Sequence, residues 1–335
     1  MGPRILTLLG CLALVAPTLC GAVEPRVSHL YELSDFNGTV PYSDVILHAD
    51  RYHDEVYAVA GNTVRVFNHS GMEIYRFDHD RTASVIADLG VDENGDILTL
   101  NFDPQARDDA SPWWITRCNY RGEPTGRIDA SGLPPEIEPF VPNRMVLHDG
   151  RIVLVCIGSL QVVVVDESGV FQKHHDLAGL LEIDDPESNI IFGFSLDRSG
   201  NMLFTIPVRF KAYVVTPDET VRVFGSAGSA PGDFGVVAGI VASDDGHYVI
   251  ADKLRRVVMV FDSSFRLVTE FAGSSRWALS RPTDLALGNG GKLYVTQSQH
   301  RGVAVLGLPA GSDAERSDDS STLNISRNSS VRNQN

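Results

Sequence analysis

The sequence predicts an all-β fold in which six four-stranded antiparallel sheets form a closed ring, and three observations lead to this prediction. Short runs rich in Val, Ile, Tyr and Phe alternate with turns rich in Gly, Asp, Asn and Ser, while helical periodicity is nearly absent. A pattern of about 47 residues recurs six times along the chain. The last copy lacks one strand, and a segment near the N-terminus resembles the missing strand.

The segment that precedes the repeats has the order of a secretory signal. Arg4 supplies a positive charge, an apolar stretch runs from Ile5 to Val15, and small residues follow up to Ala22. We therefore expect residues 1–22 to be removed after Ala22, which makes the mature protein secreted or periplasmic. Lipid attachment at Cys20 is the alternative, and Leu19 argues against it because that signal needs a small residue before the cysteine.

The first half of each repeat reads as a β-hairpin. It consists of an apolar strand, a tight turn that usually contains acidic residues and glycine, and a second apolar strand. The glycines fall where the turn needs a positive φ, which glycine adopts without a Cβ penalty. The six copies are Asp44–Val59, Leu89–Leu100, Met145–Val155, Phe194–Phe204, Ile240–Ile250 and Leu285–Val295.

A second hairpin follows in the first five repeats, which gives each repeat four strands. These hairpins are Thr63–Gly71, Trp114–Gly122, Val162–Gly169, Tyr213–Thr220 and Val257–Ser264, whereas the sixth repeat stops at Val303–Leu306. Four strands in 40 to 50 residues is the arrangement of a β-propeller blade. We expect Val27–Phe36 to pair with Val303–Leu306 and to close the ring without a long unpaired edge. An open β-solenoid is the alternative, and it does not explain the divided last unit.

The domain organisation follows from this count. Residues 23–309 are predicted to form one six-bladed β-propeller. The segment 310–335 contains few apolar residues and is predicted to be a disordered tail.

Residues 225–261 carry a family resemblance. Gly225–Phe234 is a glycine-rich segment ending in Gly-Asp-Phe, a strand follows that ends at Asp252, and Arg256 precedes an apolar strand that ends at Phe261. Together these segments resemble the NHL repeat, and 281–305 resembles a second copy with Gln297 in the place of the aspartate. The resemblance implies an NHL-like six-bladed propeller but no particular reaction, because such propellers serve several functions.

The charge of the chain excludes some partners. There are 28 Lys and Arg against 43 Asp and Glu, so the formal charge is −15 and becomes −16 once the segment with Arg4 is removed. Nonspecific binding to nucleic acid is therefore not expected. No internal apolar run approaches the roughly 18 residues of a membrane span. We expect a monomer, with Cys118 and Cys156 buried and free, although a disulfide between them is the alternative in an exported protein.

One mouth of the predicted channel collects positive charge. In a propeller the connections between second and third strands surround one mouth, and here they carry Arg107, Arg209, Lys211, Lys253, Arg255, Arg256, His300 and Arg301. This favours binding of an anionic small ligand or an acidic protein partner. Asp103, Asp108, Asp109 and Asp252 in the same connections oppose that charge. The alternative is that these charges are structural, with Asp252 and Arg256 forming an ion pair between blades.

Two tryptophans follow the longest of these connections, Asn101–Pro112. An exposed indole could stack on a sugar ring or a peptide, and strand alternation predicts that one of Trp113 and Trp114 points inward and the other outward. The predicted ligand-binding set is Arg107, Trp113, Arg209, Lys211, Lys253, Arg255, His300 and Arg301.

The sequence predicts no catalytic residues, no metal site and no cofactor. His48, His148 and His247 recur in the first hairpins, but they fall toward the mouth opposite the basic one, whereas a zinc centre needs three histidines around the axis. The strand starts expected to face the channel are Asp44, Val85, Asn143, Ile190, Val237 and Thr283. Gly288–Lys292 is followed by Leu293 and lacks the Ser or Thr of a phosphate-binding loop.

These observations predict an exported binding module without catalysis. One alternative is a hydrolase or lyase that acts in the channel, with or without a metal. The other is a structural protein that uses the sides of its blades.

Overall fold

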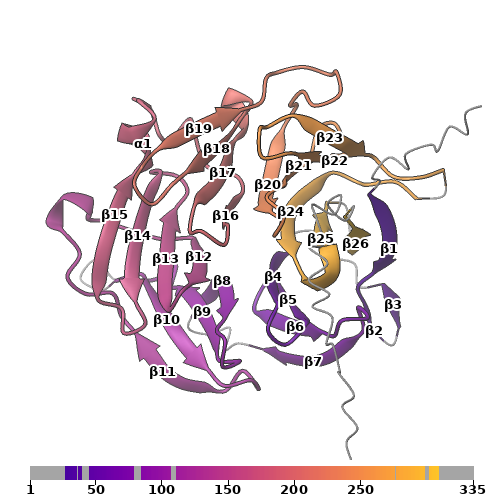
Figure 1. The fold of residues 1–335 in the computed structure, drawn as a ribbon. Coiled ribbons are helices and arrows are strands. Elements are labelled where there is room, and N and C mark those ends of the chain that lie inside the picture. The colour runs from indigo at the N-terminus through magenta and orange to yellow at the C-terminus, as the bar shows by residue number, and fades with distance from the viewer. Residues whose placement is uncertain are drawn as a thin grey trace, which may run out of the picture.

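Six four-stranded antiparallel sheets surround a common axis in the computed structural model, which describes residues 27–35, 37–39, 45–78, 84–106, 111–275, 277–298 and 302–308. Figure 1 looks along this axis, with the innermost strands β4, β8, β12, β16, β20 and β24 at the centre. The predicted all-β, six-bladed propeller is confirmed. The predicted signal peptide and the predicted tail lie outside the described residues.

The first three blades follow one another along the chain, each ordered from the axis outward. Blade 1 contains β4 (Ile46–Asp50), β5 (Glu55–Ala60), β6 (Thr63–Phe67) and β7 (Glu73–Asp78). Blade 2 contains β8 (Val85–Val91), β9 (Ile97–Phe102), β10 (Trp113–Cys118) and β11 (Pro124–Ile128). Blade 3 contains β12 (Arg144–His148), β13 (Arg151–Cys156), β14 (Gln161–Asp166) and β15 (Phe171–Asp176).

The last three blades include the one that joins both parts of the chain. Blade 4 contains β16 (Phe194–Leu196), β17 (Met202–Ile206), β18 (Lys211–Val215) and β19 (Val221–Phe224). Blade 5 contains β20 (Val237–Ala242), β21 (Tyr248–Asp252), β22 (Val257–Phe261) and β23 (Leu267–Phe271). Blade 6 contains β24 (Pro282–Leu287), β25 (Lys292–Gln297), β26 (Val303–Gly307) and, outermost, β1 (Ser28–Glu32).

A few short elements connect the blades. The hairpin of β2 (Ser34–Asp35) and β3 (Gly38–Thr39) follows β1. One α-helix turn, α1 (Leu177–Leu180), and the 3₁₀ turns η1 (Pro135–Ile137), η2 (Pro207–Arg209) and η3 (Asn289–Gly291) complete the described elements. None of the helices among these residues is long and apolar enough to cross a membrane.

The ring is closed by the N-terminal strand, as predicted. β1 pairs with β26 in antiparallel register, from Ser28 opposite Gly307 to Glu32 opposite Ala304. Beyond β1, the Leu33 amide donates to the Val303 carbonyl, and the Leu33 side chain is fully buried between blades 6 and 1. Packing between the last and the first blade rules out the open solenoid.

The core consists of six apolar clusters, and each of them lies between two neighbouring blades. The strands inside a blade are packed on both faces, so all five residues of β21 and all five of β22 are buried. Such strands appear in the sequence as continuous apolar runs rather than as alternating ones. Both cysteines are free, as predicted; Cys118 is buried, whereas the prediction that Cys156 is buried is wrong, because Cys156 ends β13 and is partly exposed.

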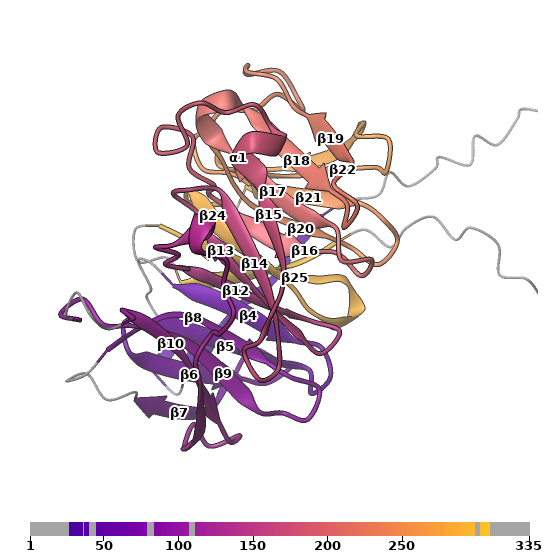
Figure 2. The ribbon, with the colours of Figure 1, turned by 90° about the vertical axis from the view of Figure 1, so that its left-hand side faces the viewer.

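The strand directions define two ends of the channel. We call the end surrounded by the connections between second and third strands the loop mouth, and the opposite end, surrounded by the turns between first and second strands, the turn mouth. Every innermost strand runs from the loop mouth to the turn mouth, because its following turn leads into the second strand. Figure 2 shows the ring from its side, with β12 to β15 of blade 3 crossing the middle of the view.

Candidate functional site

Four of the predicted binding residues gather at the loop mouth on two neighbouring blades. Arg209 lies in the connection between β17 and β18 of blade 4, and Lys211 is the first residue of β18. Lys253 and Arg255 lie between β21 and β22 of blade 5. Arg107, His300 and Arg301 fall outside the residues that the structure describes.

Two of these four cations hold the connection between blades 4 and 5 in place. The Arg255 guanidinium donates to the Asp233 carbonyl at 2.5 Å and pairs with Glu270 at 2.8 Å, and only 13% of its side chain is exposed. Lys211 Nζ donates to the Gly225 carbonyl at 2.5 Å. The groups that were predicted to meet a ligand here are therefore engaged within the fold.

The other two cations contact the segment 189–192 that leads into blade 4, Arg209 from blade 4 itself and Lys253 from blade 5. Arg209 Nε donates to Asn189 Oδ1 at 2.7 Å. Lys253 Nζ lies 5.8 Å from the centre of the Phe192 ring. These contacts bring the segment 189–192, η2 and the connection after β21 into one continuous surface.

The alternative structural role was predicted to rest on Asp252 and Arg256. Asp252 is fully buried, and its carboxylate accepts hydrogen bonds from the backbone N–H groups of Gly235, Val236 and Arg255 at 2.6, 3.1 and 2.9 Å. The predicted ion pair between Asp252 and Arg256 is wrong: no ion pair joins these two described residues, and at this mouth it is Arg255 that pairs with a carboxylate, that of Glu270. Gln297 holds the equivalent position in blade 6, where its Oε1 accepts from the Ser280 amide at 2.8 Å.

Trp113 belongs to the core and does not present its ring to the mouth. It is 5% exposed, its Nε1 donates to the Phe140 carbonyl at 2.7 Å, and its ring meets the Phe140 ring edge-on. Trp114 is the more exposed of the two and lies under the Arg127 guanidinium at 4.7 Å. The prediction that one tryptophan points inward and the other outward is confirmed, and Trp113 is the one that points inward.

Large apolar side chains are exposed on the surface that Arg209 and Lys253 link. Five of them lie in the three connected loops, with exposures between 37% and 68%. They are Ile190, Phe192, Val208, Phe210 and Leu254. We call these five residues the apolar patch.

Charge is unevenly distributed around the loop mouth. Blade 5 carries Lys253 and the exposed Arg256 on either side of Leu254, and Arg281 is exposed before blade 6. The connections before blades 3 and 4 instead carry acidic residues. The described acidic residues there are Asp129, Glu136, Glu138, Glu182, Asp184, Asp185 and Glu187. Among the residues that the structure describes, the mouth is therefore positive mainly beside blade 5, and the apolar patch lies between the two charged sectors.

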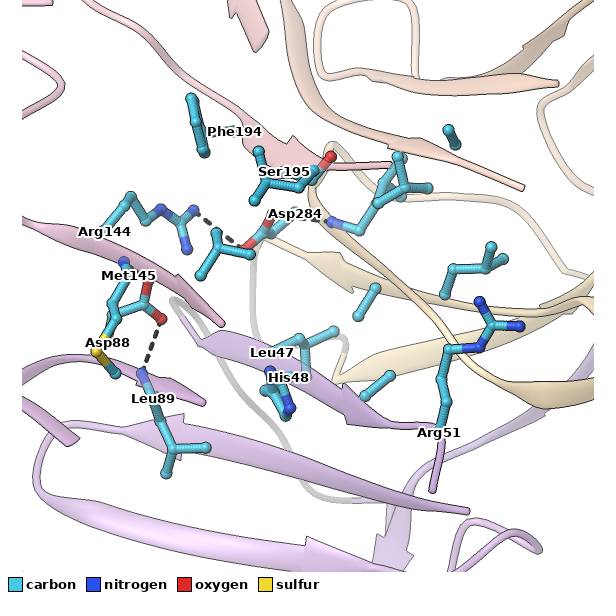
Figure 3. Close-up of a pocket in the computed structure, with 18 residues that line it drawn as sticks. Leu47, His48, Arg51, Asp88, Leu89, Arg144, Met145, Phe194, Ser195 and Asp284 are labelled. Carbon is cyan, nitrogen blue, oxygen red and sulfur yellow. Dashed lines mark hydrogen bonds and ion pairs between the residues drawn. The ribbon is translucent and has the colours of Figure 1, made fainter. Parts of the chain in front are cut away.

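The channel itself contains a second candidate site, a cavity of about 220 Å³ (Figure 3). All six innermost strands contribute to its wall, which extends from Arg144 at the start of β12 to Arg51 beyond the end of β4. The cavity thus occupies the part of the channel toward the turn mouth.

Three charged groups meet in this cavity. Arg144 of blade 3 reaches across the axis to Asp284 of blade 6, with 3.1 Å between Nη2 and Oδ2 (Figure 3). Asp88 of blade 2 is 5% exposed and accepts from the backbone N–H groups of Leu89 at 2.9 Å and Met145 at 2.7 Å. These contacts join blades 2, 3 and 6 at the centre of the ring.

The cavity changes the proton affinity of its groups. Burial raises the pKa of Asp88 to about 6, Asp284 adds to this shift, and Arg144 and the two backbone donors oppose it. Asp284 raises the pKa of Arg144, which therefore stays charged. Burial lowers the pKa of His48 to about 4, so His48 is neutral at pH 7, and its Nε2 accepts from the Val91 amide at 3.2 Å.

Replacing Asp88 with Asn is expected to change how stability depends on pH. Because the pKa of Asp88 is raised from 3.8 to about 6 on folding, its ionisation disfavours the folded state. The free energy of unfolding of the wild type, relative to Asp88→Asn, should fall by about 2 kcal/mol as the pH rises from 4 to 7. Urea unfolding of both proteins across this range measures the difference, and parallel pH profiles would contradict it.

The charged channel groups Asp88, Arg144 and Asp284 were not among the residues expected to face the channel. Of the expected residues, Asp44 lies outside the described residues, and Val85, Asn143, Ile190, Val237 and Thr283 do not line the cavity. His48, expected toward the mouth opposite the basic one, lines the cavity toward that mouth. A signal was present: a charged residue directly precedes the first apolar strand in three repeats, as Asp88, Arg144 and Asp284. Gly193 and Gly239 hold this position in blades 4 and 5.

No cluster of three or more His, Cys, Asp or Glu side chains with the arrangement of a metal site occurs in the part of the chain that the structure describes.

The fold is similar to that of several solved propellers. Virginiamycin B lyase from Staphylococcus aureus matches with a TM-score of 0.55 and 12% identity over 84% of this chain and 99% of its own. A luciferin-regenerating enzyme matches with a TM-score of 0.56 and 12% identity over 84% of this chain and 95% of its own. The Cps50 (Swd1) β-propeller domain of Myceliophteria thermophila matches with a TM-score of 0.51 and 12% identity over 81% of this chain and 98% of its own.

No protein-family model matches the sequence, and neither does any curated protein. At these low identities the structural likeness shows the fold alone. The chain is a six-bladed β-propeller, and its NHL resemblance stays a prediction.

Proposed function

We propose that this protein is an exported, non-catalytic binding module that recognises a peptide segment of a partner protein at its loop mouth. The segment would combine apolar side chains with acidic ones. The observation that carries the proposal is the apolar patch, whose five side chains come from three loops of two blades and lie beside cations.

The apolar patch has the composition of a recognition surface. Single exposed apolar residues are common on protein surfaces, but a group of five on adjacent loops is the feature that marks interaction sites. Phe192 and Phe210 provide aromatic groups, which are enriched at the centres of interfaces. Loops held by a rigid scaffold are also where propellers and other repeat folds vary most readily.

Two residues beside the loops of the patch have a left-handed backbone. Phe210 has φ 54° and Arg256 has φ 60°, values that glycine adopts without strain. Both directly precede a third strand, and Leu160 holds the same place in blade 3 with φ 57°. The conformation therefore belongs to this type of turn, and the case for the patch depends on its exposed apolar side chains.

The neighbouring charge determines which kind of segment fits. Lys253 and Arg256 flank Leu254, which is 68% exposed. An acidic residue of the partner beside an apolar one would meet these cations while the apolar side chain covers Leu254. The net charge of the protein is negative, so this local positive sector also gives an acidic segment one preferred docking position.

Selection from a random peptide library displayed on phage tests the proposal. The protein without residues 1–22 is immobilised, and the enriched peptides are synthesised and titrated by fluorescence anisotropy. We expect sequences that combine Asp or Glu with Phe, Leu or Trp. The double variant Val208→Asp, Leu254→Asp should weaken binding by more than tenfold, and Lys253→Glu with Arg256→Glu by about tenfold.

Two further variants separate binding from folding. Arg256→Gly removes a cation and relieves the left-handed conformation, so it should reduce affinity without reducing the melting temperature. Arg266→Glu reverses an arginine that is 80% exposed at the opposite mouth, and it should leave affinity unchanged. Failure to enrich any peptide, or equal binding to the wild type and the Asp variants of the patch, would refute the proposal.

A further inference from the structure

The channel cavity contains hydrogen-bond donors that the fold leaves unused. A guanidinium has five N–H groups. The Arg144 guanidinium makes one hydrogen bond among the residues that the structure describes, to Asp284. Its side chain remains 22% exposed. The four other donors are thus available to a molecule in the cavity.

The acceptors beside Arg144 already have partners. Asp88 uses both carboxylate oxygens for the amides of Leu89 and Met145. Asp284 uses Oδ1 for the Leu285 amide and Oδ2 for Arg144. Each of these four oxygens thus accepts one hydrogen bond, whereas four N–H groups of Arg144 make none, so the cavity is suited to a ligand that supplies acceptors.

His48 adds a donor to the same wall. Its Nε2 accepts from the Val91 amide, so in the neutral ring the proton resides on Nδ1. His48 lines the cavity together with Arg144 (Figure 3).

The size of the cavity limits the ligand. A cavity of about 150 Å³ lined by apolar residues is large enough for benzene. The channel cavity, at about 220 Å³, has room for an aromatic ring or a short alkyl chain with one polar group attached. Leu47, Phe194 and Leu287 supply apolar surface for such a body.

We propose that the channel cavity binds a small monocarboxylate, with the carboxylate on the Arg144 guanidinium and the apolar body against Leu47, Phe194 and Leu287. A planar guanidinium accepts a carboxylate through two parallel N–H bonds, which favours this group over a neutral amide. This site is separate from the apolar patch and does not depend on the function proposed above.

Cationic groups also stand where a ligand would arrive from the turn mouth. Arg51 and Arg198 both pair with Asp244, at 2.8 Å from Arg51 Nη1 and 2.9 Å from Arg198 Nε. The adjacent Asp245 pairs with His247 at 3.0 Å. Two guanidinium groups therefore share one carboxylate at this end of the cavity.

Binding should be linked to proton uptake at Asp88. The charged and titratable groups that face Asp88 in the cavity are Arg144, Asp284, His48 and Arg51. A bound carboxylate adds negative charge beside Asp88, whose pKa is already about 6. This charge favours the protonated form of Asp88, so affinity should rise as the pH falls from 7.5 to 5.5.

Calorimetric titration with benzoate and with its neutral analogue benzamide tests the proposal on the protein without residues 1–22. We expect benzoate to bind in a one-to-one ratio, about tenfold more tightly than benzamide and several-fold more tightly at pH 5.5 than at pH 7.5. Hexanoate serves as a second, flexible carboxylate in case the aromatic ring does not fit. If neither carboxylate binds saturably at pH 5.5, the proposal is wrong.

Two variants identify the site. Ala242→Leu places extra atoms in the cavity and keeps every charged group, so it should abolish binding while the protein stays folded. Arg144→Lys retains the positive charge but loses the planar pair of donors. It should reduce the affinity for benzoate at least tenfold and change the affinity for benzamide little. Benzoate binding that survives both variants would place the ligand elsewhere and overturn the proposal.

Discussion

Replacing Arg144 with Met should lower the free energy of unfolding by about 3 kcal/mol at pH 7.5. The change removes the cation that lies between Asp88 and Asp284 and leaves two carboxylates facing each other in a confined channel. Breaking a buried pair by removing one partner costs about 3–5 kcal/mol. The lower end is expected, because Arg144 and Asp284 keep 22% and 18% of their side chains exposed.

The pH dependence of this variant identifies the cause of the loss. Arg144 lowers the pKa of Asp88, so without Arg144 the folded-state pKa of Asp88 rises further, and stability is retained at low pH and lost as the pH rises through the raised value. Arg144→Met should therefore be much closer to the wild type at pH 4.5 than at pH 7.5. Urea unfolding at the two pH values measures this difference. The double variant Arg144→Met, Asp284→Asn should recover part of the stability at pH 7.5, and an equal loss at both pH values would show that packing is responsible.

Removing the N-terminal strand should lower the melting temperature and cause aggregation. Deleting residues 23–33 takes away β1 and leaves β26 as an exposed edge of blade 6. It also removes the buried Leu33 and the stacking of His29 on Trp277, whose ring centres are 4.0 Å apart. We expect the melting temperature to fall by about 10 °C or more and the protein to aggregate through the free edge.

Two control variants test whether this loss of stability is due to β1 itself. Deletion of residues 311–335, the polar segment at the other terminus, should leave the melting temperature unchanged. Leu33→Ala, with β1 kept, should lower the free energy of unfolding by about 2–5 kcal/mol, because it opens a cavity between blades 6 and 1. Scanning calorimetry and light scattering measure both effects. If the deletion of 23–33 melts like the wild type, β1 does not close the ring.

Most of the fold was predictable because it depends on local pattern. The strands of each hairpin appear as apolar runs, and their turns carry glycines such as Gly95 and Gly246, which have φ 85° and 83°. The missing strand of the last repeat had only one candidate in the sequence, and β1 pairs as that candidate predicted. These features depend only on residues that are close in the sequence, or on the pairing of one strand with one free sheet edge.

The site was less predictable because side-chain partners depend on distances across the ring. Arg255 looked like a free cation, but the loop between blades 4 and 5 folds back to its guanidinium. Trp113 looked like an exposed ring, but the connection before blade 3 covers it with Phe140. The sequence pattern indicates which residues lie in a loop, and it does not indicate what the other loops place beside them.

The amino-acid sequence by itself determined the number of blades, the strand that closes the ring and the mouth to which each loop belongs, because a repeat count and strand order fix all three. Only the tertiary structure decided that Arg144 and Asp284, 140 residues apart, meet across the axis. Closing six blades into a ring places opposite blades within reach of one arginine side chain. The distance between opposite blades is set by the closed ring, so it cannot be inferred from the sequence of any single repeat.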